Sequence, residues 1–189
     1  MQHKIAIEGN IGSGKTTQLD LLSGTCRVFR EPVHLWPLEE FYQDPQGKAF
    51  LMQTSVLASF KDQGPGIYER STLASKIVFT KFDTESEKMS YEMLYDRLGW
   101  NPDYWIFLES DPERCYQKVR GRRGPGDSYV TVSYLKDIDK RYKKMYELVK
   151  DRAFVVNADR PVEEVYKTIK YIIDGCIGNT SGVSVNSPA

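Results

Sequence analysis

Residues 9–16 read Gly9-Asn10-Ile11-Gly12-Ser13-Gly14-Lys15-Thr16, which matches the Walker A pattern of a phosphate-binding loop. The run follows a β-branched segment at residues 4–8 and precedes a segment with helical spacing at residues 16–23. In this setting the glycines let successive N–H groups point inward, and the positive end of the helix faces a bound phosphate. A glycine-rich turn that only caps a helix is the alternative, but the flanking strand and helix favour a phosphate site.

The polar residues of the run have the chemistry that a nucleoside triphosphate needs. Lys15 is expected to reach the β- and γ-phosphates, and the Thr16 hydroxyl to serve Mg²⁺. We expect the rest of the run, together with Thr17 in the following helix, to contact the nucleotide. The motif therefore predicts that the chain binds ATP with Mg²⁺.

The composition predicts one soluble domain without nucleic acid or membrane as a partner. The 189 residues are 40% hydrophobic and 28% charged, which is enough to close a single core. Lys and Arg number 26, as do Asp and Glu, so no overall positive field would hold a nucleic acid.

The cysteines (Cys26, Cys115, Cys176) form no CxxC pair, which argues against disulfides and a zinc site. No apolar run approaches the roughly 18 residues of a membrane span. The first strand begins by Lys4 and leaves no room for a targeting peptide, so we expect a cytoplasmic protein.

Strand-like and helix-like segments alternate along the chain. Segments rich in β-branched and aromatic residues lie at 4–8, 27–30, 66–69, 104–108 and 154–157. Segments with helical spacing lie at 16–23, 45–61, 72–82, 85–98, 111–122, 132–150 and 162–174. This order predicts an α/β domain over residues 1–174, with a five-stranded parallel sheet, helices on both faces and ligands at the carboxyl ends of the strands. Residues 175–189 lack periodicity, and we expect an irregular tail there.

Carboxylates follow the second and third strand-like segments. Glu31 precedes Pro32, which forces an extended conformation on it and would aim its side chain toward the phosphates. Phosphoryl transfer needs an acceptor for the proton of the attacking hydroxyl, and Glu31 is a candidate. Glu69 and Arg70 lie at the end of the next strand, where Glu69 would serve Mg²⁺ and Arg70 would fix Glu31. An ordinary ion pair of Glu31 and a helix start capped by Ser71 are the alternatives.

Arginines gather in a loop after the fourth strand-like segment. Residues 119–127 contain Arg120, Arg122 and Arg123 among Gly and Pro residues. Such a loop is typical of a lid that would close over the γ-phosphate and exclude water, which competes with the substrate as the acceptor of the phosphoryl group. A solvated basic loop is the alternative.

Taken together, these motifs resemble those of the deoxyribonucleoside kinase family. The matching runs are residues 9–15, 31–33 and 69–71, in the same order and spacing, and the likeness covers roughly residues 4–174. The resemblance implies a P-loop kinase fold with an arginine-containing lid and transfer of the ATP γ-phosphate to the 5′-hydroxyl of a deoxyribonucleoside in nucleotide salvage. It implies catalytic roles for Glu31 as general base, with Arg70, Lys15, Arg120 and Arg122, and a Mg²⁺ site at Thr16 and Glu69.

The resemblance also assigns residues to the substrates. Tyr42 and Asp127 would meet the sugar 3′-hydroxyl, and Gln53 would read the edge of the base. Trp36 and Phe79 would wall and stack the base. Arg122 and Asp159 would contact ATP. Asp159 belongs to residues 157–160, which resemble the loop that cradles the adenine. Core packing for Phe79 and a surface helix position for Gln53 are the alternatives. Family members form homodimers through a helix pair, and we expect the same here.

Two departures from the family pattern affect these expectations. Gly124-Pro125-Gly126 replaces polar residues in the lid, so the alignment of Arg122 and Asp127 can slip by a position or two. The positions at which purine- and deoxycytidine-preferring members carry an Asp and an Arg are Ser75 and Phe60, neither of them charged. Their absence favours thymidine or a broad pyrimidine range.

Two other functions share parts of the pattern. A thymidylate-type nucleoside monophosphate kinase has the same loop, sheet and lid, but its charged acceptor needs no general base. A non-catalytic nucleotide-binding switch would need a guanine motif, for which residues 157–159 are a poor substitute.

Overall fold

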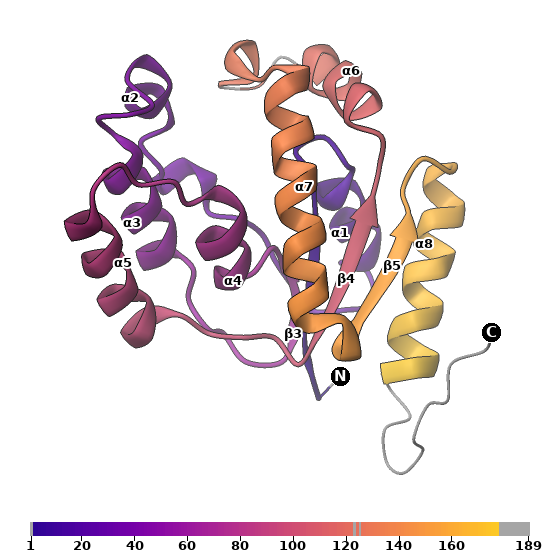
Figure 1. The fold of residues 1–189 in the computed structure, drawn as a ribbon. Coiled ribbons are helices and arrows are strands. Elements are labelled where there is room, and N and C mark those ends of the chain that lie inside the picture. Colours follow the sequence, from indigo (N-terminus) through magenta and orange to yellow (C-terminus); the bar gives the residue numbers. More distant parts are fainter. Residues whose placement is uncertain (1, 123, 125, 178–189) are drawn as a thin grey trace.

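The computed structural model describes residues 2–122, 124 and 126–177. Its sheet has five parallel strands in the order β2-β3-β1-β4-β5 (Figure 1). They are β1 (Lys4–Gly9), β2 (Val28–Phe29), β3 (Gly66–Glu69), β4 (Tyr104–Glu109) and β5 (Ala153–Asn157). The predicted five-stranded parallel sheet is confirmed, with strand bounds within two residues of the expected ones.

Helices connect the strands. They are α1 (Lys15–Leu22), α2 (Leu38–Gln43), α3 (Ala49–Ser59), α4 (Thr72–Ala74), α5 (Glu85–Leu98), α6 (Pro112–Arg122), α7 (Val132–Val149) and α8 (Val162–Tyr171). Short 3₁₀ or π turns lie at Val33–Leu35, Ser75–Phe79, Asp127–Tyr129, Lys150–Arg152 and Ile172–Ile177. Within the described residues, every helix is too short or too polar to span a membrane.

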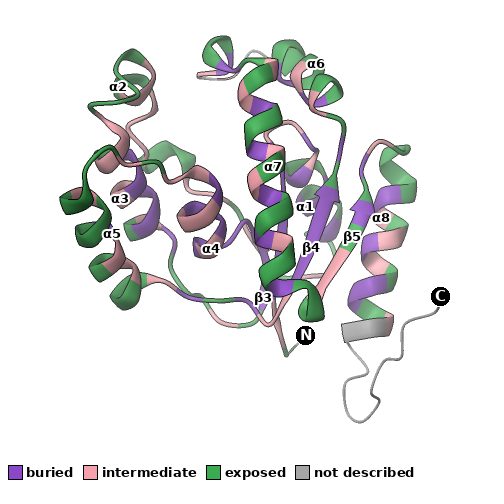
Figure 2. Cartoon of the chain, in the orientation of Figure 1, coloured by how far each residue is buried: buried purple, intermediate pink, exposed green. Residues whose placement is uncertain are grey.

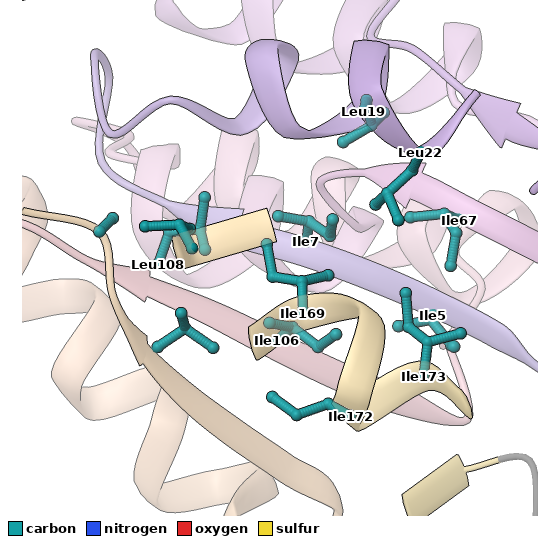
Figure 3. Packing of buried hydrophobic residues seen from close by; sticks show 13 residues of the cluster. Ile5, Ile7, Leu19, Leu22, Ile67, Ile106, Leu108, Ile169, Ile172 and Ile173 are labelled. Carbon is teal, nitrogen blue, oxygen red and sulfur yellow. The ribbon is translucent and has the colours of Figure 1, made fainter. Parts of the chain in front are cut away.

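Both faces of the sheet are covered, as expected. On one face Ile5, Ile7 and Ile106 pack against α1 and α8, whose Leu19 and Ile169 point toward the strands (Figure 3). On the other face Ala6, Trp105 and Phe107 pack against α4 and α7. The two sets alternate along β1 and β4 because successive side chains of a strand point to opposite faces. Figure 2 shows buried and exposed residues alternating along α7, as expected for a helix that packs one face on the sheet.

The segment between β2 and β3 differs from the prediction. One helix is expected over residues 45–61, but α3 begins only at Ala49 because Asp44 holds a turn before it. The Asp44 side chain accepts a hydrogen bond from the Gly47 N–H at 2.9 Å, and its carbonyl accepts one from the Lys48 N–H. The preceding helix α2 is not predicted, although Pro37 with two acidic residues in the first turn is a helix-start signal.

Two further segments depart from expectation. The helix expected over residues 72–82 is α4 followed by a π turn that ends at Phe79, because Thr80 donates both its N–H and its hydroxyl to the Ser75 carbonyl. At the C-terminus, helical turns continue to Ile177, so the first three residues of the expected irregular tail are helical. The rest of that tail, residues 178–189, lies outside the described residues.

Candidate active site

A cavity of about 730 Å³ lies at the carboxyl ends of β1, β2 and β3. Its size is in the range of small-molecule sites, and its walls come from segments far apart in the chain. They are the loop after β1, residues 30–56, the end of β3 with the turn that follows, and the segment from α6 to α7. Three strand ends therefore meet at one hollow, on the edge of the sheet where ligands are expected.

The phosphate-binding loop forms one end of this cavity. Residues that line it are Ile11, Gly12, Gly14, Lys15, Thr16 and Thr17. Gly9, Asn10 and Ser13 lie behind them and hold the loop: the Asn10 amide donates to the Leu135 carbonyl at 2.8 Å, and the Ser13 N–H to the Asn10 carbonyl at 3.1 Å. Gly12 has a φ of 83°, and a Cβ there would lie 2.5 Å from the Cys115 carbonyl oxygen, so only glycine fits.

Lys15 is buried at the start of α1. Its ammonium donates to the carbonyls of Gly9 and Asn10, both at 3.0 Å. Burial, with the nearby charge of Arg70, lowers the pKa of Lys15 to about 8. The loop therefore holds a cation at the phosphate end of the cavity by two hydrogen bonds to its own carbonyl groups.

Thr16 and Glu69 meet in the cavity, as the motifs predict. The Thr16 hydroxyl donates to Glu69 Oε1 at 2.6 Å, and both residues line the hollow. Within residues 2–122, 124 and 126–177 no cluster of three or more His, Cys, Asp or Glu side chains forms a metal centre. Mg²⁺ is commonly held by one or two carboxylates plus substrate phosphates, so a hydroxyl and a carboxylate beside the phosphate loop fit it.

Glu31 and Arg70 form a buried ion pair inside the cavity. Arg70 Nε lies 2.6 Å from Glu31 Oε1, and the two side chains are 8% and 11% exposed. Burial raises the pKa of Glu31, while Arg70 and Lys15 oppose that rise. The pair extends to Phe79, whose ring centroid lies 4.1 Å below the guanidinium of Arg70. Arg70 thus fixes Glu31 beside the phosphate end. Glu31 forms an ion pair, as the alternative interpretation expects, but this ion pair lies inside the cavity.

The other end of the cavity is largely aromatic. The predicted residues Trp36, Tyr42, Gln53 and Phe79 all line it. Gln53 is buried, and its Oε1 has no hydrogen-bond partner among the described residues. Tyr42 stacks on Tyr129 with ring centroids 5.0 Å apart. Flat apolar walls with an unpaired amide oxygen suit a planar ligand that carries hydrogen-bonding groups on its edge.

Several cavity residues are missing from the sequence prediction. Met52 and Val56 share the Gln53 side of α3, and Tyr134 of α7 lines the hollow with a pKa that burial raises to about 12. The helical spacing of Met52, Gln53 and Val56 is a signal for one shared face. Tyr134 gives no comparable signal. Ser75, which the sequence predicts as an uncharged position of the base pocket, also lines the cavity, and its buried hydroxyl is unpaired within the described part of the chain.

The lid brings Arg122 and Asp127 together. Arg122 donates from two nitrogens to the two oxygens of Asp127, each at 2.8 Å, and both residues line the cavity. Burial raises the pKa of Asp127, but hydrogen bonds from Arg122 and the Gly124 N–H bring it below its ordinary value. Arg122 and Asp127, both predicted for the lid, therefore bind each other in this structure.

Two predicted site residues lie away from the cavity. Arg120 is exposed on α6 and does not line it, because it lies about 200° around the helix from Lys118 and Arg122, which do. Asp159 accepts hydrogen bonds from the Ser110 hydroxyl at 2.6 Å and the Asp111 N–H at 3.0 Å, so it ties the ends of β4 and β5 together. Arg123, the third lid arginine, lies outside the described residues.

Comparison with known proteins places this geometry in a family. The family model described as deoxynucleoside kinase matches residues 5–174. Thymidine kinase of Ictalurid herpesvirus 1 (strain Auburn) is 30% identical over 88% of this chain and 84% of its own. Deoxyguanosine kinase of Dictyostelium discoideum is 31% identical over 74% of this chain and 57% of its own. A solved deoxyadenosine kinase of M. mycoides with bound dATP has the same fold, with a TM-score of 0.77 at 24% identity, covering 92% of this chain and all of that one. The likeness to that structure shows the P-loop kinase fold, the family match indicates a nucleoside kinase phosphotransferase, and the chain belongs to the deoxynucleoside kinase family.

Proposed function

We propose that this protein transfers the γ-phosphate of ATP to the 5′-hydroxyl of a deoxyribonucleoside, in the salvage of DNA precursors. The observation that carries the proposal is the Glu31–Arg70 pair, which lies between a phosphate loop and an aromatic pocket in one cavity. A base at that point is what a neutral hydroxyl acceptor needs, and a monophosphate acceptor does not.

The residues divide the reaction among them. Glu31 takes the proton of the 5′-hydroxyl as the oxygen bonds to the γ-phosphorus, and ADP departs with the electrons of the broken bond. Lys15 and Arg122 stabilise the charge that gathers on the phosphoryl oxygens, for which Arg122 exchanges Asp127 for the phosphate. Asp127 is then free for the sugar 3′-hydroxyl. Thr16 and Glu69 would hold Mg²⁺, which supplies further charge neutralisation when bound.

The base pocket favours thymidine or a broad pyrimidine range. Gln53 offers a donor and an acceptor to the edge of the base. A second polar side chain of the cavity that is unpaired among the described residues is Ser75, which is neutral. Phe60 lies outside the cavity lining and packs on Trp36, with centroids 5.9 Å apart. The relatives include proteins named for thymidine, deoxycytidine, deoxyguanosine and deoxyadenosine, so the pocket chemistry carries this part of the proposal.

A panel of acceptors tests the proposal. ATP consumption is measured with the four common deoxynucleosides and with their monophosphates, with and without Mg²⁺. We expect Mg²⁺-dependent turnover with deoxynucleosides, fastest with thymidine or deoxycytidine. Turnover confined to thymidine monophosphate would indicate a thymidylate-type kinase, and preferential GTP binding without acceptor-dependent turnover would indicate a nucleotide switch.

The lid glycine Gly126 gives a test of the sugar site. A Cβ there would lie 2.1 Å from the Tyr42 ring, which also stacks on Tyr129, and the φ of Gly126 is 78°. Gly126→Ala should therefore displace Tyr42 and raise the KM for the nucleoside about tenfold, the effect of one lost hydrogen bond. Gly121→Ala is the control, since a Cβ at Gly121 meets nothing within 4 Å. An unchanged KM in the Gly126 variant would remove Tyr42 from the sugar site.

We also propose that the protein is a homodimer, as its resemblance to the family implies, and that it is cytoplasmic, as the sequence predicts. Light scattering of the purified chain tests the assembly, and the mass of a monomer at micromolar concentration would contradict it. Fluorescence of a tagged full-length chain in its own cell tests the compartment.

A further inference from the structure

Arg70 has an unusual backbone for the residue that holds Glu31. Among the described residues it is the one non-glycine with a positive φ, at 70°. Left-handed conformations are uncommon for residues with a Cβ, and they persist where the surroundings hold them. The Arg70 side chain reaches Glu31 from this turn, so the contacts that hold the turn also set the position of the guanidinium.

The contacts that hold the turn come from β1. The Arg70 N–H donates to the Ile7 carbonyl at 3.0 Å. The next residue of each segment repeats the link with a side chain: Glu8 Oε1 accepts the Ser71 N–H at 2.8 Å and the Ser71 hydroxyl at 2.6 Å. The other oxygen of Glu8 accepts the Tyr142 hydroxyl of α7 at 3.4 Å. One carboxylate therefore joins the turn to β1 and α7.

We propose that Glu8 is a positioning residue for phosphoryl transfer, which holds the Arg70–Ser71 turn so that Arg70 meets Glu31. This role rests on the proposed function, because it acts through the general base. Glu8 itself is fully buried and does not line the cavity, so it touches neither substrate. Its place at the penultimate position of a buried strand gives it no signal in the sequence other than an acid in an apolar run.

The surroundings of Glu8 indicate that its hydrogen bonds, more than its charge, carry the role. Burial raises the pKa of Glu8 to about 7, against the opposing effects of Arg70, Ser71 and Lys15. A carboxylate so close to neutrality can be replaced by an amide of the same shape. The amide oxygen would accept from Ser71, and the amide NH₂ would donate to the Tyr142 oxygen.

Two variants at this position separate positioning from mere packing. Glu8→Ala removes the acceptor, and we expect kcat to fall about 10- to 100-fold, as for a small misplacement of a reacting group, with the KM for the nucleoside changed less than about threefold. Glu8→Gln keeps the acceptor and should restore kcat to within about threefold of the wild type. Unchanged kcat in folded Glu8→Ala would overturn the role, and so would an equal loss in the two variants.

A double variant tests whether Glu8 acts through Arg70. Arg70→Lys should lower kcat by itself, and adding Glu8→Ala should then have little further effect, since effects on one shared contact are not additive. An undiminished further loss would contradict the proposal. If Glu8→Ala does not fold, Ser71→Ala decides, because it removes one of the two donors to Glu8 Oε1; an unchanged kcat there would overturn the role. Wild-type turnover separates the outcomes: a wild type that phosphorylates no nucleoside refutes the proposed function, not this positioning role alone.

Discussion

Replacing Glu31 with glutamine is expected to lower kcat by about 10²- to 10⁴-fold, the range for loss of a general base, with little change in nucleoside KM. Glutamine keeps an oxygen where Glu31 Oε1 faces Arg70 Nε, so the shape of the pair is kept while the proton acceptor is lost. The measurement is steady-state kcat and KM with the best deoxynucleoside of the panel.

The pH dependence gives a second readout of the same residue. A general base works when ionised, so activity falls as the pH drops through its pKa. Because burial raises the pKa of Glu31, this acid limb should lie at higher pH than that of an exposed glutamate. The limb should be missing in Glu31→Gln. Glu39→Gln, an exposed carboxylate of α2, is the matched control. Near-normal turnover in Glu31→Gln would refute the role of base.

The strand-end residues were predictable because their signals are local. Glu69 ends a strand, and Lys15, Thr16, Glu31 and Arg70 come soon after one; parallel strands bring their carboxyl ends to one edge. Topology alone then places them in one hollow. Their mutual contacts, Thr16 with Glu69 and Arg70 with Glu31, follow from that placement.

The rest of the site depends on side-chain directions that no local pattern states. Arg120 and Lys118 are both basic residues of α6, but they point in different directions around the helix, and only Lys118 of the two lines the cavity. Arg122 and Asp127 appear as separate lid residues in the sequence, yet they bind each other. Glu8 reads as a strand residue, and only the register of β1 against β3 brings it to Ser71.

Replacing Lys15 with methionine is expected to lower kcat/KM for ATP by about 10²- to 10³-fold, as for loss of one preorganised donor to the reacting group. The Lys15 ammonium is held by the Gly9 and Asn10 carbonyls at the phosphate end of the cavity, and methionine keeps its length without its charge. The KM for the nucleoside should change little, because the aromatic end of the cavity is untouched. Initial rates over a range of ATP concentrations measure the effect.

The lowered pKa of Lys15 also predicts how kcat/KM for ATP depends on pH in the wild-type enzyme. The free enzyme loses the ammonium charge as the pH rises through about 8, so kcat/KM for ATP should decline on that side of neutrality. The decline belongs to Lys15 only if Lys15→Met lacks it and Lys144→Met, a change at an exposed lysine of α7, retains it. A Lys15→Met enzyme with wild-type kcat/KM for ATP would mean that the backbone N–H groups of the loop, with Arg122, suffice to hold the phosphates, and the charge at position 15 would need another explanation.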